Sequence, residues 1–264
     1  MSGLAKDRRL KLLPCVLVLC ILASSTKVGP SGGQIERGWV GASAALEVDS
    51  CLQGNALRHP PGEKTRVLEE AEGFIWRLEG VPQHPYWPQG KSGVTWGVGW
   101  DAGQHTASEL RQTWMDLGSK AVDALSITAG RKGIEARELL PSVQHILIPE
   151  AVAKAVFKEL ELPKYYAEMI ATFPGATQLP TGVQVALLSL VFNRGAGLGK
   201  VLPDNIDSRF EIRTVKRAVS ERDITGIYYR FSNMTRVWEE TSTKKGMEVR
   251  RRKEMQLIRP YICF

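Results

Sequence analysis

The segment from residue 80 to residue 104 restricts the fold more than any other part of the sequence. It holds prolines at positions 82, 85 and 88 and glycines at positions 90, 93, 97, 99 and 103. Proline removes a backbone donor and glycine weakens regular structure, so no long helix is expected to pass through this segment. From position 94 to position 99, Val, Trp and Val alternate with Thr, Gly and Gly. This alternation predicts a short strand or a hairpin with tight turns.

Helical patterns flank this segment on both sides. Before it, apolar residues recur at three- and four-residue steps from Val67 to Leu78, which predicts a helix, although Gly73 could end that helix early. After it, Thr106 and Glu109 have the spacing of a capping box at a helix start. The sequence therefore predicts an α+β fold that is mostly helical, with a small β-hairpin subdomain beside a larger helical lobe and a cleft between the two.

The C-terminal half adds helices of two kinds. Residues 184–192 are nearly all apolar, and Pro149 precedes another apolar run, so both segments are expected to form core helices. Residues 212–240 and 247–258 are expected to form amphipathic helices with basic faces.

The N-terminal end has the layout of an export signal. Basic residues precede an uncharged apolar run, Leu12–Ala23, which is short for a membrane span. We expect residues 1–25 to be a signal peptide, with an uncleaved N-terminal anchor as the alternative, residues 26–61 to be a flexible linker, and residues 62–264 to be one folded domain. Without residues 1–25 the net charge falls from +7 to +4, which is too modest to indicate nucleic-acid binding.

Whether the cysteines form a disulfide depends on the compartment to which the chain is exported. Cys15 and Cys20 lie in the expected signal peptide, whereas Cys51 and Cys263 lie near the two ends of the remaining chain. An oxidising compartment would let Cys51 and Cys263 form a disulfide. The alternative is that they are two unrelated thiols.

Three polar side chains around the glycine-rich segment are candidates for catalysis. Glu72 falls on the edge of the apolar stripe of the predicted helix, where partial burial would favour the protonated form of a carboxyl group. Asp101 ends the glycine-rich strand and Thr95 lies six residues earlier, so on one strand both would face one side and could hold one water. A proton donor and a water-activating carboxylate are what glycoside hydrolysis needs. The alternative is a surface glutamate, an ordinary strand threonine and a turn aspartate.

The block around these residues resembles a known family. Glu72-Gly73 is followed, 22 residues after the glycine, by Thr95 in Ser-Gly-Val-Thr-Trp-Gly-Val-Gly-Trp-Asp-Ala-Gly-Gln. This is similar to the active-site block of the pesticin-like muramidases, which are relatives of phage-type lysozymes. The resemblance implies that Glu72, Thr95 and Asp101 are the catalytic residues. Their order is that of pesticin, whereas classical phage lysozymes have the order Glu, Asp, Thr.

Two later segments extend the resemblance over about residues 62–260. Leu187-Leu-Ser-Leu-Val-Phe-Asn-Arg-Gly is similar to the family's central helix, and Gly246-Met-Glu-Val-Arg-Arg-Arg-Lys-Glu-Met is similar to its closing helix. Asn193 could equally cap its helix, and residues 250–252 could form a solvated or ion-paired face. Three positions depart from the family's usual residues and so leave the shape of the groove open: Trp96, Trp100 and Ala102.

The resemblance implies a lysozyme-like fold and a muramidase, which cleaves the β-1,4 bond between N-acetylmuramic acid and N-acetylglucosamine, with inversion expected. Together with the signal-like N-terminus and the modest charge, it leads us to expect an exported monomer, periplasmic or secreted, that binds peptidoglycan strands, with no nucleic-acid partner and no membrane contact beyond an uncleaved anchor. The four histidines show no HExxH or paired-cysteine spacing, so no metal or other cofactor is expected. Two alternatives stay open. One is a non-catalytic peptidoglycan-binding or virion-structural protein whose tryptophans are sugar platforms, and the other is a chitinase-like hydrolase.

Overall fold

The computed structural model describes residues 60–202 and 207–262 of the chain. The expected signal peptide, nearly all of the expected linker, and both Cys51 and Cys263 lie outside these ranges. What the sequence predicts for them therefore stays a prediction. Within the described ranges, no helix is both long enough and apolar enough to cross a membrane.

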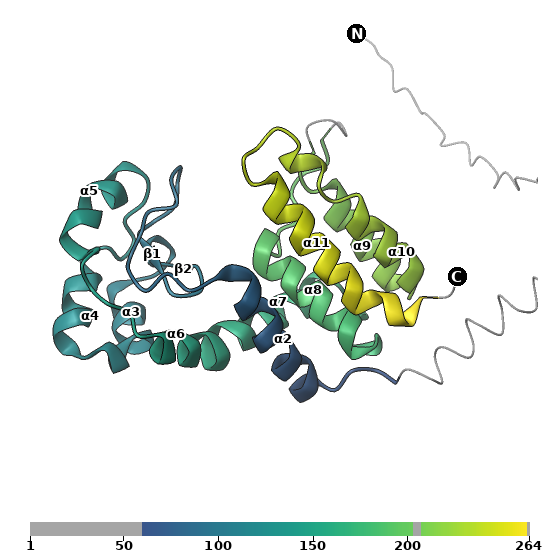
Figure 1. Cartoon of the computed structure of the whole chain (residues 1–264), viewed down its shortest axis with the longest axis horizontal. Coiled ribbons are helices and arrows are strands. Elements are labelled where there is room, and N and C mark those ends of the chain that lie inside the picture. Colours follow the sequence, from purple (N-terminus) through teal and green to yellow (C-terminus); the bar gives the residue numbers. More distant parts are fainter. Residues whose placement is uncertain (1–59, 203–206, 263–264) are drawn as a thin grey trace, which may run out of the picture. The chain divides into compact units, whose positions relative to one another are not determined.

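Helices dominate the described chain, and one small hairpin interrupts them (Figure 1). The α-helices are α2 (Lys64–Glu79), α3 (Ala107–Thr113), α4 (Ser119–Ser126), α5 (Ile134–Val143), α6 (Glu150–Val156), α7 (Leu162–Thr172), α8 (Thr181–Arg194), α9 (Phe210–Ser220), α10 (Ile224–Ser232) and α11 (Lys244–Ile258). The strands β1 (Thr95–Trp96) and β2 (Trp100–Asp101) pair antiparallel. A π-helical turn, η3 (Phe157–Glu161), joins α6 to α7. The predicted α+β fold, mostly helical with a small hairpin, is confirmed.

Helix α2 runs without a break through the glycine at which it could have ended. Gly73 lies inside α2, and the Arg77 side chain folds back over it, so that a Cβ on Gly73 would lie 3.2 Å from Arg77 Nη1. The helix ends at Glu79 because Gly80 adopts a φ of 65°, which side chains disfavour. The alternative of an early end after Glu72 is therefore wrong.

The hairpin pairs two residues that the sequence analysis placed on one strand. Thr95 lies opposite Asp101, and Trp96 lies opposite Trp100. The turn at residues 97–99 contains two glycines with positive φ, which permits the chain to reverse within three residues. Thr95 and Asp101 are neighbours on one face because they are cross-strand partners, and not because their separation along one strand is even.

A third backbone segment lies against β1. Tyr86 and Thr95 form an isolated antiparallel bridge, in which each backbone N–H donates to the other residue's carbonyl oxygen over 2.8 Å. Tyr86, Thr95 and Asp101 therefore lie on three adjacent segments. The chain that leads from α2 into the hairpin is fixed to the strand that carries Thr95.

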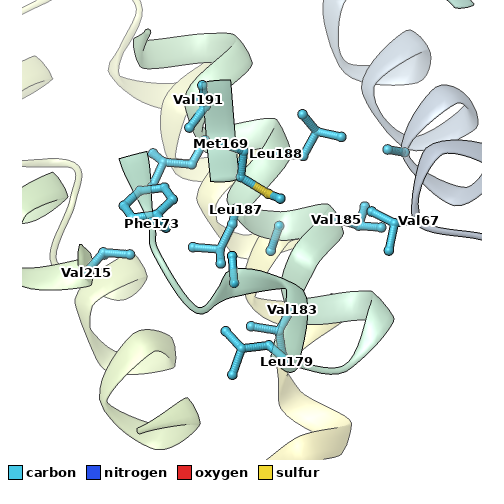
Figure 2. Close-up of a cluster of buried hydrophobic side chains, with 14 of the residues drawn as sticks. Val67, Met169, Phe173, Leu179, Val183, Val185, Leu187, Leu188, Val191 and Val215 are labelled. Carbon is cyan, nitrogen blue, oxygen red and sulfur yellow. The ribbon is translucent and has the colours of Figure 1, made fainter. Parts of the chain in front are cut away.

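The larger hydrophobic cluster is built around α8. Residues 181–191 of this helix are buried, and α2, α7 and α11 pack against it. Figure 2 shows Val67 from α2, Met169 from α7 and Val215 from α9 in this cluster beside side chains of α8. A helix surrounded on all sides needs apolar residues all round. The core helix predicted at residues 184–192 is confirmed.

A second hydrophobic cluster surrounds the hairpin. The rings of Trp96, Trp100 and Trp114 have centroids 5.0 to 5.7 Å apart, and none of these residues is more than 4 % exposed. They are core residues, so the alternative that the tryptophans form sugar platforms is wrong for Trp96 and Trp100. Trp76 of α2 packs against both hydrophobic clusters.

Helix α11 is joined to α8 by a buried ionic cluster. Glu254 is fully buried, pairs with Arg250 at 3.3 Å and with Arg251 at 2.9 Å. It also accepts a hydrogen bond from Ser189 Oγ at 2.6 Å. Arg251 donates to Asn193 Oδ1 at 3.0 Å. The ion-paired interpretation is confirmed for Arg250 and Arg251, whereas Asn193 binds α11 rather than capping α8.

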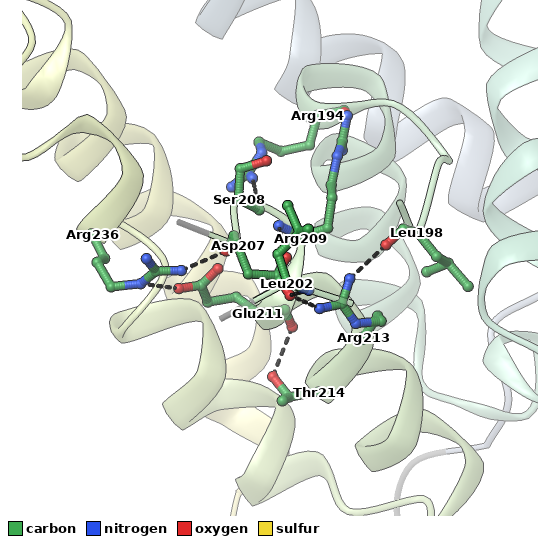
Figure 3. Close-up of polar contacts among 10 residues, drawn as sticks. All are labelled: Arg194, Leu198, Leu202, Asp207, Ser208, Arg209, Glu211, Arg213, Thr214 and Arg236. Atoms are coloured by element: carbon green, nitrogen blue, oxygen red, sulfur yellow. Dashed lines mark hydrogen bonds and ion pairs between the residues drawn. The ribbon is translucent and has the colours of Figure 1, made fainter. Parts of the chain in front are cut away.

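A second ionic cluster surrounds the start of α9 (Figure 3). Arg213 pairs with Asp207 and donates to the Leu198 carbonyl oxygen at 2.7 Å. Arg236 pairs with Glu211 at 2.8 Å and donates to the Asp207 carbonyl oxygen at 2.7 Å. Both carboxylates are buried, so each needs its arginine to remain charged inside the protein.

Replacing Glu254 with alanine should destabilise the fold. Glu254→Ala leaves the buried Arg251 without its carboxylate and Arg250 with Glu79 alone, and removing one partner of a buried ion pair costs about 3 to 5 kcal/mol of unfolding free energy. Chemical denaturation measures this loss. Gln256→Ala, at an exposed position of the same helix, should change the stability by less than about 0.5 kcal/mol. Equal stabilities of the two variants would contradict the structural role of the cluster.

Candidate active site

The backbone around the hairpin holds the carboxylate of Asp101. Its Oδ1 accepts hydrogen bonds from Gly93 N at 2.9 Å and from Gly103 N at 2.8 Å. The second bond caps the short 3₁₀ turn η1 (Ala102–Gln104). Its Oδ2 has a longer contact of 3.4 Å with Gln104 Nε2. One carboxylate oxygen therefore fixes the side chain, and the other is left to bind a water or a ligand.

Thr95 lies directly opposite Asp101 and is 3 % exposed. Its hydroxyl donates to the Gly93 carbonyl oxygen at 3.3 Å. Because this bond uses the hydroxyl proton, the lone pairs of Oγ1 are free to accept a hydrogen bond. Thr95 Oγ1 and Asp101 Oδ2 are thus two acceptors on neighbouring residues, which is the arrangement that orients a water by both of its protons.

The close packing beneath Asp101 requires glycine. A Cβ on Gly93 would lie 2.3 Å from Asp101 Oδ1 and 2.3 Å from Gly103 N, and a Cβ on Gly103 would lie 2.7 Å from the Arg131 carbonyl oxygen. Any side chain at these positions would push the backbone away from the carboxylate. These two glycines of the segment therefore make room for the hydrogen bonds that hold Asp101.

Glu72 lies in the middle of α2 and has two cationic partners. Its carboxylate oxygens pair with Lys154 Nζ at 3.6 Å and with Lys158 Nζ at 3.8 Å. The side chain of Glu72 is 17 % exposed, whereas both lysines are more than half exposed. Glu72 is therefore ion-paired with one lysine of α6 and one lysine of η3.

A second glutamate, Glu79, is the last residue of α2. Its Oε1 accepts a hydrogen bond from Arg250 Nη1 and so forms an ion pair with this arginine. Arg250 also donates to Glu254 at 3.3 Å and, through Nη2, to the Ser189 carbonyl oxygen at 3.2 Å and hydroxyl at 3.1 Å. Glu79 is therefore attached to the buried ionic cluster between α8 and α11.

Two tyrosines are influenced by charges in this region. Burial raises the pKa of Tyr86, and the charges of Glu79 and Asp101 raise it further. Burial also raises the pKa of Tyr165, on α7, to about 12, and nearby glutamates that include Glu79 contribute. The negative charges of Glu79 and Asp101 thus both favour the protonated phenol of Tyr86.

His105 covers the indole of Trp100. The two rings are stacked, with centroids 4.3 Å apart and planes 6° apart. Burial lowers the pKa of the His105 imidazole, and the charge of Lys164 lowers it further, against smaller opposing effects of carboxylates that include Asp101. His105 is therefore a neutral ring at pH 7 and contributes to the packing of the hairpin.

An open cavity of about 410 Å³ lies between α2 and α11. Its cationic lining consists of Arg77 from α2 and Lys245, Arg250 and Lys253 from α11. Such a lining attracts anionic ligands, and Arg250 places the cavity next to Glu79. The cleft that the sequence predicts between the hairpin and the helical lobe stays a prediction.

The structure brings two of the three predicted site residues together. Thr95 and Asp101 are direct cross-strand neighbours. In residues 60–202 and 207–262, no hydrogen bond or ion pair joins Glu72 to either of them, and its ionic partners are Lys154 and Lys158. The role of Glu72 stays a prediction.

The model of one protein family matches residues 65–209: Pesticin, a bacterial toxin homologue of phage lysozyme, C-terminal part. The chain belongs to this family. The match confirms the resemblance drawn from the glycine-rich block and the lysozyme-like fold. No curated protein matches the chain. The matched range begins in α2 and ends at the residue before α9. Helix α11, which carries Arg250, therefore lies outside the matched range.

The sequence analysis assigned no role to Glu79, and it interpreted Arg250 only as part of a solvated or ion-paired face. One signal was available, because a second Glu-Gly pair, Glu79-Gly80, follows Glu72-Gly73 by seven residues. The first pair was chosen as the catalytic one because its distance from Thr95 along the chain matches the spacing in the family. The partner of Glu79 lies 171 residues further along the chain, and no local pattern could have joined the two.

Replacing Gly93 with alanine should disturb the hydrogen bonds that hold the Asp101 carboxylate. Because the new Cβ would lie 2.3 Å from Oδ1, Gly93→Ala should lower the free energy of unfolding by about 1 to 3 kcal/mol, as overpacking does. Denaturation followed by tryptophan fluorescence measures this change. Gly197→Ala is the matched control because open space surrounds its Cβ position, and its stability should stay within about 0.5 kcal/mol of the wild type. Indistinguishable variants would show that the packing is looser than described.

Proposed function

We propose that the pesticin domain is a muramidase that hydrolyses the β-1,4 bond between N-acetylmuramic acid and N-acetylglucosamine in peptidoglycan. The Thr95–Asp101 pair carries this proposal. A buried hydroxyl lies opposite a carboxylate whose Oδ1 is fixed by two backbone amides. Membership in a family of phage-lysozyme homologues supports a glycosidase.

In this mechanism the water is oriented by the two acceptors. It donates one hydrogen bond to Thr95 Oγ1 and the other to Asp101 Oδ2, so that a lone pair of the water oxygen points toward the sugar carbon. As the water attacks that carbon, Asp101 takes up one of its protons. The departing oxygen needs a second proton from a carboxylic acid. We propose Glu72 as this donor, because the Glu72-Gly73 pair and its spacing to Thr95 are similar to the active-site block of the family.

The reaction is proposed to invert the anomeric carbon, because the water attacks directly and no covalent sugar–enzyme bond forms. Inverting glycosidases separate their two carboxyl groups by about 6.5 to 9.5 Å to leave room for this water. Thr95 beside Asp101 fits a water-holding role better than a nucleophilic one, since a nucleophile has no need of a second acceptor.

The substrate lies outside the cytoplasmic membrane, so the proposed function requires export. We therefore keep the proposal that residues 1–25 direct the chain to the periplasm or the exterior, where it acts as a monomer. The charge of +4 expected without residues 1–25 would favour the approach to an anionic cell envelope.

Replacing Asp101 with asparagine tests the water-holding pair. Asp101→Asn keeps an oxygen that can accept from Gly93 and Gly103 but removes the basic carboxylate, so activity should fall about 100- to 10,000-fold. New reducing ends released from purified sacculi, identified by mass spectrometry, measure the activity. Asp116→Asn, at an exposed position, is the control and should act like the wild type. Full activity of Asp101→Asn would remove Asp101 from the mechanism.

The stereochemistry of the product tests the direct attack of water. An inverting enzyme acting on a β-linkage should first release the α-anomer at the new muramic acid reducing end. Proton NMR during the first minutes, before mutarotation, detects this anomer. A β-anomer as the first product would show retention. Release from chitin but not from sacculi would instead support the chitinase-like alternative, and binding to sacculi without any release would support the non-catalytic one.

A further inference from the structure

Two lysines beside Glu72 form a cationic pair on consecutive helical turns. Lys154 lies in α6, and Lys158 lies in η3, which continues α6 without a break. Residues four apart on a helix are neighbours, and like charges at this spacing repel each other. The two ammonium groups lie 3.6 and 3.8 Å from oxygens of the Glu72 carboxylate. Glu72 is therefore the counter-charge that both lysines share.

The hydrogen-bonding capacity of this cationic pair is unused in residues 60–202 and 207–262. The contacts of 3.6 and 3.8 Å with Glu72 are too long to be hydrogen bonds, and neither ammonium group donates to another residue in these ranges. Each ammonium group has three donors, and the two lysine side chains are 51 % and 60 % exposed. The pair can therefore donate hydrogen bonds to an anion that arrives from solvent.

The role of proton donor that we propose for Glu72 removes the counter-charge of the lysines. A glutamic acid that carries the proton it will donate is neutral and forms no ion pair. Lys154 and Lys158 then have no carboxylate partner in the part of the chain that the structure describes. An anionic group of the substrate would restore the charge balance at the stage of the reaction at which Glu72 is protonated.

Helix α6 lies beside the hairpin (Figure 1), and the two are in contact next to Lys154. A Cβ on Gly97, in the turn that joins β1 to β2, would lie 3.6 Å from the Cβ of Ala153. Lys154 follows Ala153 directly in α6. The residue before the first lysine of the cationic pair is thus packed against the hairpin that carries the water-holding pair.

Peptidoglycan contains a suitable anion, and chitin does not. N-acetylmuramic acid has a lactyl group with a carboxylate, and the peptide stem is attached to this group through an amide bond and has carboxylates of its own. Chitin consists of N-acetylglucosamine and has no carboxylate. Two lysines beside the proton donor would therefore distinguish substrates whose sugar backbones have the same linkage.

We propose that Lys154 and Lys158 bind a carboxylate of the muramic acid unit or of its peptide stem, and that this contact selects peptidoglycan over chitin. The inference rests on the muramidase function and on the donor role of Glu72 proposed above. The bound carboxylate replaces Glu72 as the partner of the two ammonium groups. The lysines determine specificity, whereas the bond is cleaved by Glu72 and the water-holding pair.

The test combines uncharged lysine variants with charged and neutral substrates. The variants are Lys154→Gln, Lys158→Gln and the double variant, and the control is Lys120→Gln at an exposed position of α4. The substrates are purified sacculi, glycan strands freed of their stems by an amidase, and the same strands after their lactyl carboxylates have been converted to methylamides. The methylamide strands keep the sugar backbone and its linkage but have lost the charge.

The variants should differ from the wild type in KM more than in kcat. On the substrate that has the bound carboxylate, each single variant should raise KM about fivefold and the double variant about 25-fold. Added salt should reduce this difference, because salt screens exposed charges. On the methylamide strands the variants and the wild type should have the same KM, since no carboxylate is present. Lys120→Gln should behave like the wild type on every substrate.

The two charged substrates identify the carboxylate. If the lysines bind the lactyl carboxylate, the rise in KM appears on the stem-free strands and is absent from sacculi, where this group is part of an amide bond. If the lysines bind a carboxylate of the stem, the rise is confined to sacculi. Either pattern supports the proposal and names the group that is bound.

Two results would overturn the proposal. An equal loss of activity on charged and neutral strands would show that the lysines act through Glu72 or through the fold. An unchanged KM of the double variant on both sacculi and stem-free strands would show that no carboxylate is bound.

Binding separates this inference from the proposed function. Calorimetry with the Asp101→Asn chain, with and without the two lysine changes, measures the affinity for charged and methylamide strands without bond cleavage. Lower affinity of the lysine variants for charged strands alone is the expected result. A wild type that cleaves no substrate but shows this lysine-dependent binding would refute the proposed function and leave the carboxylate site unaffected.

Discussion

The hydrogen bonds from two glycine amides to Asp101 Oδ1 are the constraint on which the hairpin depends. They join Gly93, just before β1, to Gly103, just after β2, so one carboxylate closes the ends of a sheet that is only two residues long on each side. A sheet this short is marginal by itself. The same bonds give the two oxygens of Asp101 different roles. Oδ1 is hydrogen-bonded to the backbone, and Oδ2 is the oxygen to which we propose that a water binds. Structural and catalytic interpretations of this aspartate are therefore compatible.

The second constraint is the buried ionic cluster that links α8 and α11. A fully buried Glu254 between two arginines is costly to desolvate, and burial raises the pKa of its carboxyl group. The cluster is useful because Arg250 extends from it to Glu79 and thereby connects the helical core to the end of α2. These buried ion pairs thus hold the C-terminal end of α2 against α11.

Much of the fold could be predicted from the sequence because its signals are local. The glycines and prolines of residues 80–104 excluded a helix, the Thr106–Glu109 capping box formed as expected, and the apolar run of α8 is buried. Even so, the strand register was not available from periodicity, and Thr95 and Asp101 are neighbours for a different reason than the one predicted. The contact between Glu79 and Arg250 could not be predicted, because it joins segments 171 residues apart. Trp96 and Trp100 show the same limit, since a tryptophan beside a candidate site can equally be a core residue, and only the packing distinguishes the two.

The clustering of three indoles around the hairpin has a practical consequence for spectroscopy. Trp96, Trp100 and Trp114 are closely packed in the cluster that surrounds the strands, whereas the far-ultraviolet dichroism of the chain arises mainly from its helices. Fluorescence emission and near-ultraviolet dichroism thus report chiefly on the smaller cluster, and far-ultraviolet dichroism on the larger one. Melting curves recorded by tryptophan fluorescence and by far-ultraviolet dichroism would reveal whether the two hydrophobic clusters unfold in one cooperative transition or in succession.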